Sequence, residues 1–313
     1  MTERILWSVV QLVVLLALSP LVSGAIRKMK ARLQMRRGPG VFQPYRELYK
    51  LFRKGMVIPD TASWVFTAAP FVVFVTAASV GLMVPAFTAE APLSVFGGVL
   101  ALVYLLGLGR FSLALAGLDA GSSFGGLGSS REMTVAALAE PAMMLAMFTV
   151  ALSAGSTNLS EVARSAIGQS WRFLAPSQIL AFAALFIVLI AETGRIPVDN
   201  PATHLELTMI HEAMILEYSG PYLALIEWGA AVKQLVLMTL FVNLFLPFGL
   251  VASPAAPGLA VSIAIYLAKI LVLCILVVLV ETTNAKLRLF RIPELLALAF
   301  VLGALALIST FLF

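Results

Sequence analysis

Eight long apolar segments constrain this chain more than any other feature of its sequence. They lie near residues 5–25, 63–87, 93–116, 132–154, 175–193, 222–247, 259–281 and 293–313. An α-helix needs about 20 apolar residues to cross the hydrocarbon core of a bilayer. Only 12% of the residues are charged, about half the fraction found in soluble domains. We therefore expect an all-α polytopic membrane protein, with about eight transmembrane helices forming a single transmembrane domain over residues 1–313.

Lys and Arg residues are distributed unevenly between the loops of this expected bundle. The first, third, fifth and seventh loops hold fifteen of the 21, whereas the N-terminus and the even-numbered loops hold three. Cytoplasmic loops carry an excess of Lys and Arg, so we expect these four loops in the cytoplasm and both termini on the outer side. The basic first loop also argues against a cleaved signal peptide ending at "ALSPLVSGA". The net charge of +5 reflects this asymmetry and gives no indication of nucleic-acid binding.

Cysteine and histidine are scarce, which limits the cofactors that the chain can hold. The single cysteine, Cys274, lies in an apolar segment, so this chain alone forms no disulfide and holds no iron–sulfur cluster. The two histidines, His204 and His211, lie close together in the fifth loop and argue against a bis-histidine haem in the membrane. A metal site formed by them with Glu212 stays open as an alternative, although no HExxH motif supports it.

The first loop reads "RKMKARLQMRRGPGVFQPYRELYKLFRKG". Tyr45, Leu48, Tyr49 and Phe52 recur at helical spacing among basic residues, which predicts an amphipathic helix in the headgroup region of the membrane. In "RRGPG", two arginines precede a Gly-Pro-Gly turn, which fixes a bend beside concentrated charge. This arrangement favours a docking surface for another subunit, and the alternative is a simple positive anchor.

The third loop, "GLDAGSSFGGLGSSREM", is rich in glycine and serine. We expect a flexible link at 121–128 that pairs Asp119 with Arg131 and packs against a soluble partner. The loop is similar to a phosphate-binding loop only in its glycines, because it lacks the GKS or GKT ending. Together with Arg195 of the fifth loop, these residues complete the predicted docking set. Its members are Arg36, Arg37, Gly38, Pro39, Asp119, Arg131 and Arg195.

Charged residues inside apolar segments point to an ion path. Each charge at the bilayer centre costs about 2.5–3.5 kcal/mol on insertion scales, so such groups face the bundle interior and form pairs. Arg110 lies near the cytoplasmic end of the third segment. A proton or ion path would use such groups, and structural pairing between helices is the alternative. The predicted path residues within the segments are Glu140, Glu227, Lys233 and Lys269.

The stretch "AETGRIPVDNPATHLELTMIHEAMILEYSG" at 191–220 holds five of the chain's sixteen acids and both histidines. Pro197 and Pro201 end the preceding helix, and residues 203–220 are predicted to form a second, partly buried helix. Carboxylates on one face of such a helix suit proton transfer through water. The path residues predicted in this stretch are Glu192, Asp199, His204, Glu206, Glu212 and Glu217.

The motifs "AETGRIPVDNP" and "LEYSG" resemble the signature of the membrane subunit at the heel of respiratory complex I, its subunit 1. The same family includes the membrane subunit of group 4 energy-converting [NiFe]-hydrogenases, such as formate hydrogenlyase and hydrogenase-4. The resemblance covers nearly the whole chain. The first loop, which lacks the longer glycine-rich insertion of complex I, and the third loop favour the hydrogenase branch.

This resemblance implies a tilted bundle in the inner membrane that couples redox chemistry in partner subunits to H⁺ or Na⁺ movement. The implied partners are the soluble hydrogenase large and small subunits, an iron–sulfur protein, antiporter-like membrane subunits and membrane lipid. The [NiFe] centre and iron–sulfur clusters would lie in those partners, with none bound by this chain. Alternatives are a complex I subunit that forms a quinone site, and a passive membrane anchor. Ala202 and His204 stand where the family often has glutamates, so His204 would relay protons in place of a carboxylate.

Overall fold

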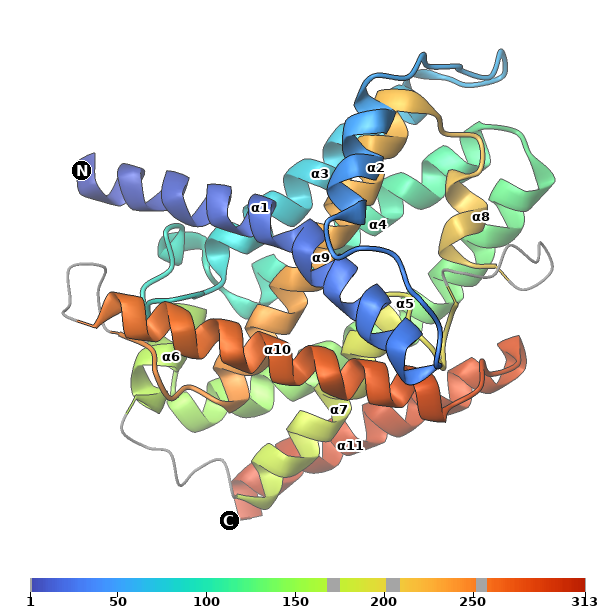
Figure 1. Cartoon of the computed structure of the whole chain (residues 1–313). Coiled ribbons are helices and arrows are strands. Elements are labelled where there is room, and N and C mark those ends of the chain that lie inside the picture. Colours follow the sequence, from blue (N-terminus) through green and yellow to red (C-terminus); the bar gives the residue numbers. More distant parts are fainter. Residues whose placement is uncertain (1, 168–174, 201–208, 252–257, 313) are drawn as a thin grey trace.

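The computed structural model describes residues 2–167, 175–200, 209–251 and 258–312 (Figure 1). Seven helices in this part of the chain are long and apolar enough to cross a membrane, and an eighth apolar helix of 17 residues is shorter. The seven long helices are α1 (Thr2–Leu33), α3 (Trp64–Met83), α4 (Val99–Asp119), α5 (Ser123–Ala154), α9 (Gly220–Phe245), α10 (Leu259–Thr283) and α11 (Ile292–Leu312). The short one is α7 (Pro176–Glu192). The predicted all-α membrane bundle is confirmed.

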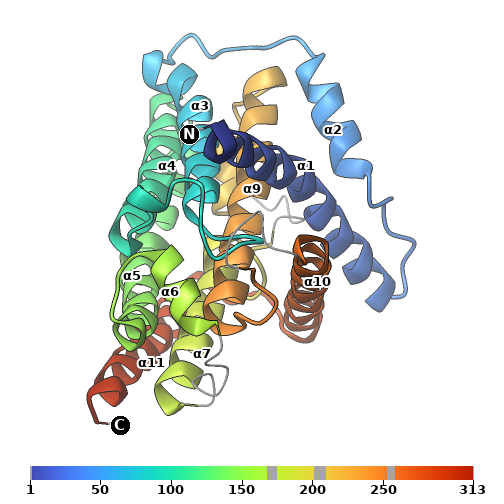
Figure 2. The ribbon, with the colours of Figure 1, turned by 90° about the vertical axis from the view of Figure 1, so that its left-hand side faces the viewer.

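The helices cross one another at marked angles. Helix α11 packs against α5 and α7, and α3 packs against α4 and α9. Helices α1 and α10 pass in front of the steeply inclined α9 (Figure 1), and α10 and the short α2 (Gln43–Phe52) lie at one side of the bundle (Figure 2). Tilt of this kind brings residues of distant sequence segments to the same depth in the bundle.

The two ends of the bundle differ in character. The loops at 34–42, 120–122 and 284–288 lie together at the right of Figure 1, and we call this the basic end. The loop after α7 joins them, because the Leu287 N–H donates to the Pro197 carbonyl at 2.9 Å. The opposite, far end carries the segment 84–98, which is largely buried and paired at Thr88 with the segment after α9.

Buried amide side chains hold the segment 84–98 in place at the far end. Gln11 of α1 donates to the carbonyls of Gly81 (2.9 Å) and Val84 (3.0 Å). Asn243 of α9 donates to those of Pro85 (2.7 Å) and Ala86 (3.0 Å). Buried backbone carbonyls need such partners, and the amides that supply them do not titrate.

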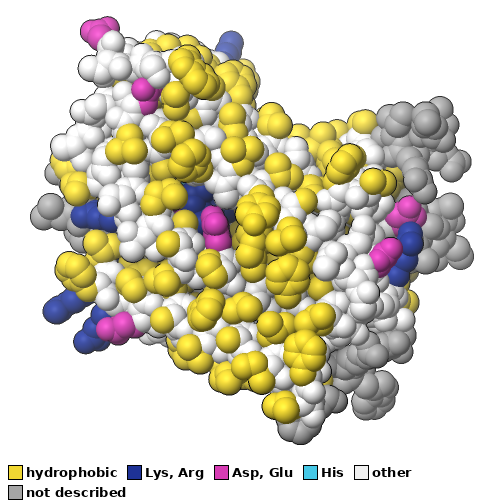
Figure 3. All heavy atoms as spheres, turned by 180° about the vertical axis from the view of Figure 1, so that it is seen from behind, with side chains coloured by type: hydrophobic (Ala, Val, Ile, Leu, Met, Phe, Trp, Pro, Cys, Tyr) yellow, Lys and Arg dark blue, Asp and Glu magenta, His cyan; other side chains and the backbone are white. Residues whose placement is uncertain are grey.

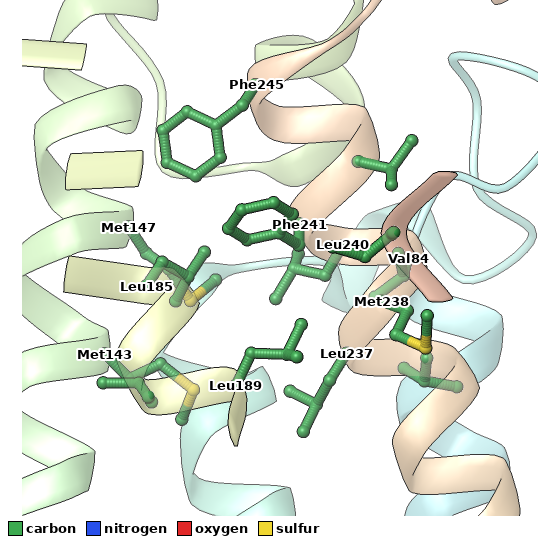
Figure 4. Close-up of a cluster of buried hydrophobic side chains, with 14 of the residues drawn as sticks. Val84, Met143, Met147, Leu185, Leu189, Leu237, Met238, Leu240, Phe241 and Phe245 are labelled. Carbon is green, nitrogen blue, oxygen red and sulfur yellow. The ribbon is translucent and has the colours of Figure 1, made fainter. Parts of the chain in front are cut away.

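The apolar core lies where α5, α7 and α9 meet (Figure 4). Phe241 and Phe245 of α9 face Leu185 of α7, and the centroids of their two rings are 5.4 Å apart. Met147 of α5 closes the other side of this layer. Helices in lipid associate through close van der Waals packing rather than through removal of water, so this layer fixes how the three helices approach one another.

The start of α5 contradicts the predicted flexible link at 121–128. The helix begins at Ser123, nine residues before the predicted span. A Cβ atom on Gly125 would lie 2.2 Å from the Gly117 carbonyl oxygen of α4, and one on Gly128 would lie 2.9 Å from the Ile210 carbonyl oxygen. The glycines therefore permit close helix packing, and they do not serve to make the segment flexible.

Two shorter helices complete the basic end. The predicted amphipathic helix is α2 (Gln43–Phe52). The Tyr45 hydroxyl donates to the Ala17 carbonyl of α1, and the Phe52 ring meets the Trp228 ring of α9 edge-on. The helix predicted at 203–220 is wrong in extent, because α8 (His211–Ile215) has only five residues and ends before a turn at 216–217.

Candidate functional site

Arg110 of α4 is the centre of a buried group of charges. Its Nη1 lies 3.0 Å from Glu140 Oε1, its Nε lies 3.4 Å from Glu132 Oε1, and its Nη2 donates to Glu192 Oε2. The Lys233 ammonium of α9 lies 2.8 Å from the same Glu192 oxygen. Arg110 is only 7% exposed, and a charge this deeply buried needs opposite charges around it. We call these five residues the Arg110 cluster.

The local sequence explains why these carboxylates converge. Glu132 and Glu140 are eight residues apart on α5, just over two turns, so both face α4. Gly107 of α4 makes room for the second of them, because a Cβ there would lie 3.3 Å from Glu140 Oε1. Glu192 is the last residue of α7, and Gly194 then takes a left-handed backbone conformation (φ 58°) that turns the chain away.

Arg195 lies at the centre of a second buried group. Its Nη1 lies 3.1 Å from Glu281 Oε1 of α10, and its Nη2 donates to Gln234 Oε1 of α9 at 2.8 Å. Lys30 of α1 lies 2.9 Å from the other Glu281 oxygen. Ser23 of α1 also donates to Gln234 Oε1, at 3.2 Å. We call these five residues the Arg195 cluster.

The two clusters form one charged band across the bundle. Lys233 and Gln234 are neighbours on α9, and each belongs to a different cluster. The band therefore runs from α5 through α4, α7 and α9 to α10 and α1. Its contacts are side-chain pairs between six different helices or their ends, which is why sequence spacing within one helix does not reveal them.

A cavity of about 100 Å³ borders the Arg110 cluster towards the basic end. A water molecule occupies about 30 Å³ in the liquid, so the space suits roughly three waters. Small-molecule sites are larger, at roughly 300–1,000 Å³, so the cavity gives no support to the expected alternative of a quinone site. The titratable residues that line it are Glu132, Glu192, Asp199, His211, Glu212 and Lys233.

Asp199 fastens the loop that lines this cavity. Its Oδ1 pairs with Lys286 Nζ at 2.6 Å and accepts from the Asn200 N–H at 2.8 Å. Its Oδ2 accepts from the N–H groups of Ile210 (3.3 Å) and His211 (3.4 Å). One carboxylate thus joins Asn200, the start of α8 and the loop between α10 and α11.

Only some of the predicted path residues lie in the charged band or at the cavity. Glu140, Glu192 and Lys233 belong to the Arg110 cluster, and Asp199 and Glu212 line the cavity. His204 and Glu206 lie outside the described residues.

The other three lie apart from the band. Glu217 is exposed after α8, and Glu227 is half-buried on α9, six residues before Lys233. Lys269 donates to the Leu246 carbonyl at 2.5 Å, twelve residues and about 18 Å along α10 from Glu281. Lys269 thus lies apart from the Arg110 cluster and supports the end of α9, and its place on an ion path stays a prediction.

The predicted docking residues also divide. Arg36, Arg37 and Pro39 are exposed at the basic end, and Gly38 packs closely on α1, where a Cβ would lie 2.4 Å from Ala31 Cβ. Their docking role stays a prediction.

The predicted pair of Asp119 with Arg131 is wrong. Asp119 Oδ2 accepts from the Ser63 (2.7 Å) and Phe66 (3.2 Å) N–H groups at the start of α3. Arg131 donates to the Met209 carbonyl at 2.8 Å. Arg195 is 8% exposed, so its side chain is not available for docking on the surface of this chain. All three side chains thus fasten the basic end from within.

Sequence reasoning missed several members of the band. Glu132 was grouped with the polar third loop, although its distance of eight residues from Glu140 places both on one helix face. Glu281 and Lys30 lie at or near the ends of membrane-spanning segments. Charges are common there, so their presence does not indicate a buried ion pair. Within the described ranges, no three His, Cys, Asp or Glu residues lie close enough to hold a metal ion.

Comparisons with known proteins identify the family. The NADH dehydrogenase family model matches residues 6–312. Hydrogenase-4 component C of Escherichia coli K12 is 38% identical over 96% of this chain and 94% of its own length, and formate hydrogenlyase subunit 4 of the same organism is 35% identical over 97% and 98%. An NADH-quinone oxidoreductase subunit of Rubrobacter xylanophilus is 31% identical over 71% of this chain and 68% of its own length.

A solved structure shares the fold. A chain in the structure of the membrane-bound sulfane sulfur reductase, an archaeal respiratory membrane complex, aligns with a TM-score of 0.85 at 20% identity, over 98% of this chain and 99% of its own. At that identity, the likeness supports the fold alone. The matches of the family model and of the two Escherichia coli proteins extend over nearly the whole sequence. The chain therefore belongs to the NADH dehydrogenase family, and its predicted resemblance to hydrogenase-4 and formate hydrogenlyase subunits is confirmed.

Proposed function

We propose that this chain is the membrane subunit of a membrane-bound [NiFe]-hydrogenase complex that couples redox chemistry in its partners to ion translocation. The observation that carries this proposal is the charged band. Burying each charge costs several kcal/mol before pairing, and a passive anchor needs none of them. Intramembrane ionisable groups that face the bundle interior commonly mark ion and proton paths.

The cavity is the entrance of the proposed path. It lies towards the basic end and brings His211 and Glu212 beside Glu132 and Glu192. Water in the cavity would connect the His211 imidazole to the carboxylates. Redox events in a soluble arm at the basic end would thereby reach the Arg110 cluster.

The path leaves the bundle sideways, at Glu140. Its side chain is 33% exposed and lies about 12 Å further along α5 than Glu132. Figure 3 shows an acidic side chain near the centre of an otherwise hydrophobic face, with Lys or Arg atoms beside it. An antiporter-like membrane subunit placed against this α4–α5 face would receive the ion, because Glu140 is the member of the Arg110 cluster that reaches this face.

The basic end is the docking face for the soluble arm. Arg36 and Arg37 project there beside a rigid turn, and arginine pairs well with carboxylates on a partner surface. The large and small hydrogenase subunits and an iron–sulfur protein would bind here and carry the [NiFe] centre and clusters. In this proposal, the basic end faces the cytoplasm and both termini lie on the outer side of the inner membrane.

Glu140→Gln tests the proposal in the intact complex, in sealed vesicles. Glutamine keeps the shape and loses the titration, so we expect coupled ion transport to fall about ten-fold or more while dye-linked hydrogen oxidation is retained. Glu161→Gln is the matched control, because Glu161 lies on α6 (Leu159–Ala166), at the far end of the bundle and away from the Arg110 cluster. If the Glu140→Gln complex transports normally, the chain acts as an anchor only.

A further inference from the structure

We propose that Arg110 is a positioning residue that makes Glu132, Glu140 and Glu192 share one transferable proton. This inference rests on the proposed function, because it explains how an ion passes from the cavity to the α4–α5 face. Its basis is the geometry of the guanidinium contacts and the number of charges around them.

The contacts of Arg110 are unusual for a buried arginine. Arginine commonly binds one carboxylate with two parallel hydrogen bonds. Here Nε, Nη1 and Nη2 each face a different carboxylate. Arg110 Nε and Glu192 Oε1 are two of the six buried side-chain N or O atoms in the described ranges that have no hydrogen-bond partner. A buried polar atom without a hydrogen-bond partner needs an explanation. For Glu192 Oε1, the explanation is that this oxygen accepts the proton during transfer.

The charges of the cluster do not balance. Arg110 and Lys233 supply two positive charges against three carboxylates. Full ionisation would leave one negative charge of the partly buried cluster uncompensated, and a proton on one carboxylate removes that cost. Arginine stays charged in proteins, so the proton resides on a carboxylate. Glu192 contacts both cations, which leaves Glu132 and Glu140 as the two resting places.

These two resting places face different surroundings. Glu132 lines the cavity, whereas Glu140 reaches the outer face of the bundle. In the transfer, the O–H bond of Glu132 breaks and one forms at the free Glu192 Oε1. That bond then breaks as one forms at Glu140, which leaves Glu132 ionised and Glu140 neutral. The cluster's total charge stays constant because the proton moves between its own carboxylates. The Arg110 contact strengthens on the carboxylate that has become ionised.

The other charged groups around Arg110 are consistent with this arrangement. Helix α8 brings His211 and Glu212 to the cavity, and α9 brings Lys233. Helix α3, which also packs against α4, contributes no titratable side chain. Among the described residues, the titratable groups that α8 and α9 bring to the cluster therefore lie on its cavity side.

Arg110→Lys tests the inference in the intact complex in sealed vesicles. Lysine keeps the charge, but its single ammonium cannot hold three carboxylates in a fixed fork. We expect normal dye-linked hydrogen oxidation, with coupled transport reduced about ten-fold. The pH profile of the residual transport should move upward by roughly 1–3 units, because carboxylates that the shorter lysine ammonium no longer contacts bind protons more tightly. A role limited to holding helices together would not shift this profile.

Arg164→Lys is the matched control, because Arg164 pairs with Glu90 at 3.1 Å and is half-exposed away from the cluster. If Arg110→Lys transports like this control at every pH, the inference is overturned. If Arg110→Lys does not assemble, the charge-compensated double variant Arg110→Gln/Glu132→Gln decides. Assembly with less transport than Glu132→Gln alone supports the inference, whereas transport equal to that of Glu132→Gln, or renewed failure to assemble, overturns it.

Glu140→Gln separates this inference from the proposed function. If Glu140→Gln blocks transport while Arg110→Lys leaves it unchanged, the proposed path is supported and the proposed role of Arg110 is wrong. If Glu140→Gln transports normally, the proposed function itself falls.

Discussion

Glu192 and Arg195 are one helical turn apart at the end of α7, yet they belong to separate ion-pair groups. Glu192 contacts Arg110 and Lys233, and Arg195 contacts Glu281. The left-handed Gly194 between them turns the backbone so that the two side chains diverge. The motif "AETGRIPVDN" therefore joins several helices. Its Glu192 links the end of α7 to α4 and α9, and its Arg195 links it to α9 and α10.

Arg195→Gln should destabilise the protein. It leaves Glu281 buried with fewer opposite charges, and breaking a buried pair costs about 3–5 kcal/mol. We expect a lower thermal midpoint of the detergent-solubilised protein and less of it in membranes. Arg288→Gln, at an exposed position of the basic end, is the control. A stable Arg195→Gln protein that merely releases soluble subunits would restore the docking role predicted from sequence.

Gly125→Ala should weaken the contact between α4 and α5. The added Cβ would lie 2.2 Å from the Gly117 carbonyl oxygen, and this backbone atom cannot move aside cheaply. Overpacking of this kind costs about 1–3 kcal/mol, measurable as a lower thermal midpoint. Gly126→Ala is a control one residue away, because its Cβ would make only an ordinary contact of 3.9 Å with the Leu118 side chain. Equal stability of the two variants would argue that α5 is not held this closely to α4.

Replacing Arg36 and Arg37 together with alanine should release soluble subunits from the membrane. Both side chains are exposed beside the turn at Gly38 and Pro39, so the change removes charge without opening a cavity. Hydrogenase activity in the soluble and membrane fractions measures the effect, and Arg164→Ala at the far end is the control. If the soluble subunits stay bound and only ion coupling changes, the docking assignment is wrong.

Tyr218 predicts a loss of stability at high pH. It lies outside the membrane spans, stacks on Phe66 and donates to the Phe66 carbonyl at 2.8 Å. Burial raises the pKa of Tyr218 above the ordinary value of about 10. The folded state therefore keeps the phenol proton that the unfolded state loses, and stability falls as pH rises above about 10. Tyr218→Phe should flatten this part of the pH dependence of the thermal midpoint, and an unchanged slope would contradict it.

The helices could be predicted from sequence because each apolar segment carries its own signal. The start of α5 could not be predicted, because a glycine-rich segment that packs closely against Gly117 has the same composition as a flexible loop. The charged band was predicted only in part. Glu140, Glu192 and Lys233 are predicted because they lie in or beside apolar segments. That Arg110 pairs with the two carboxylates and Lys233 with Glu192 depends on which helices are neighbours. No spacing within a single chain segment contains that information.

Glu132→Gln and Glu227→Gln distinguish the observed band from the path predicted by sequence. Glu132 contacts Arg110 and lines the cavity, whereas Glu227 lies on α9 outside the band. We expect Glu132→Gln to reduce coupled ion transport about ten-fold in sealed vesicles, because the cavity loses the carboxylate that connects it to Arg110 Nε. Glu227→Gln should transport at the wild-type rate. Reversal of the two results would place the path along α9 and leave the Arg110 cluster as a structural contact between helices.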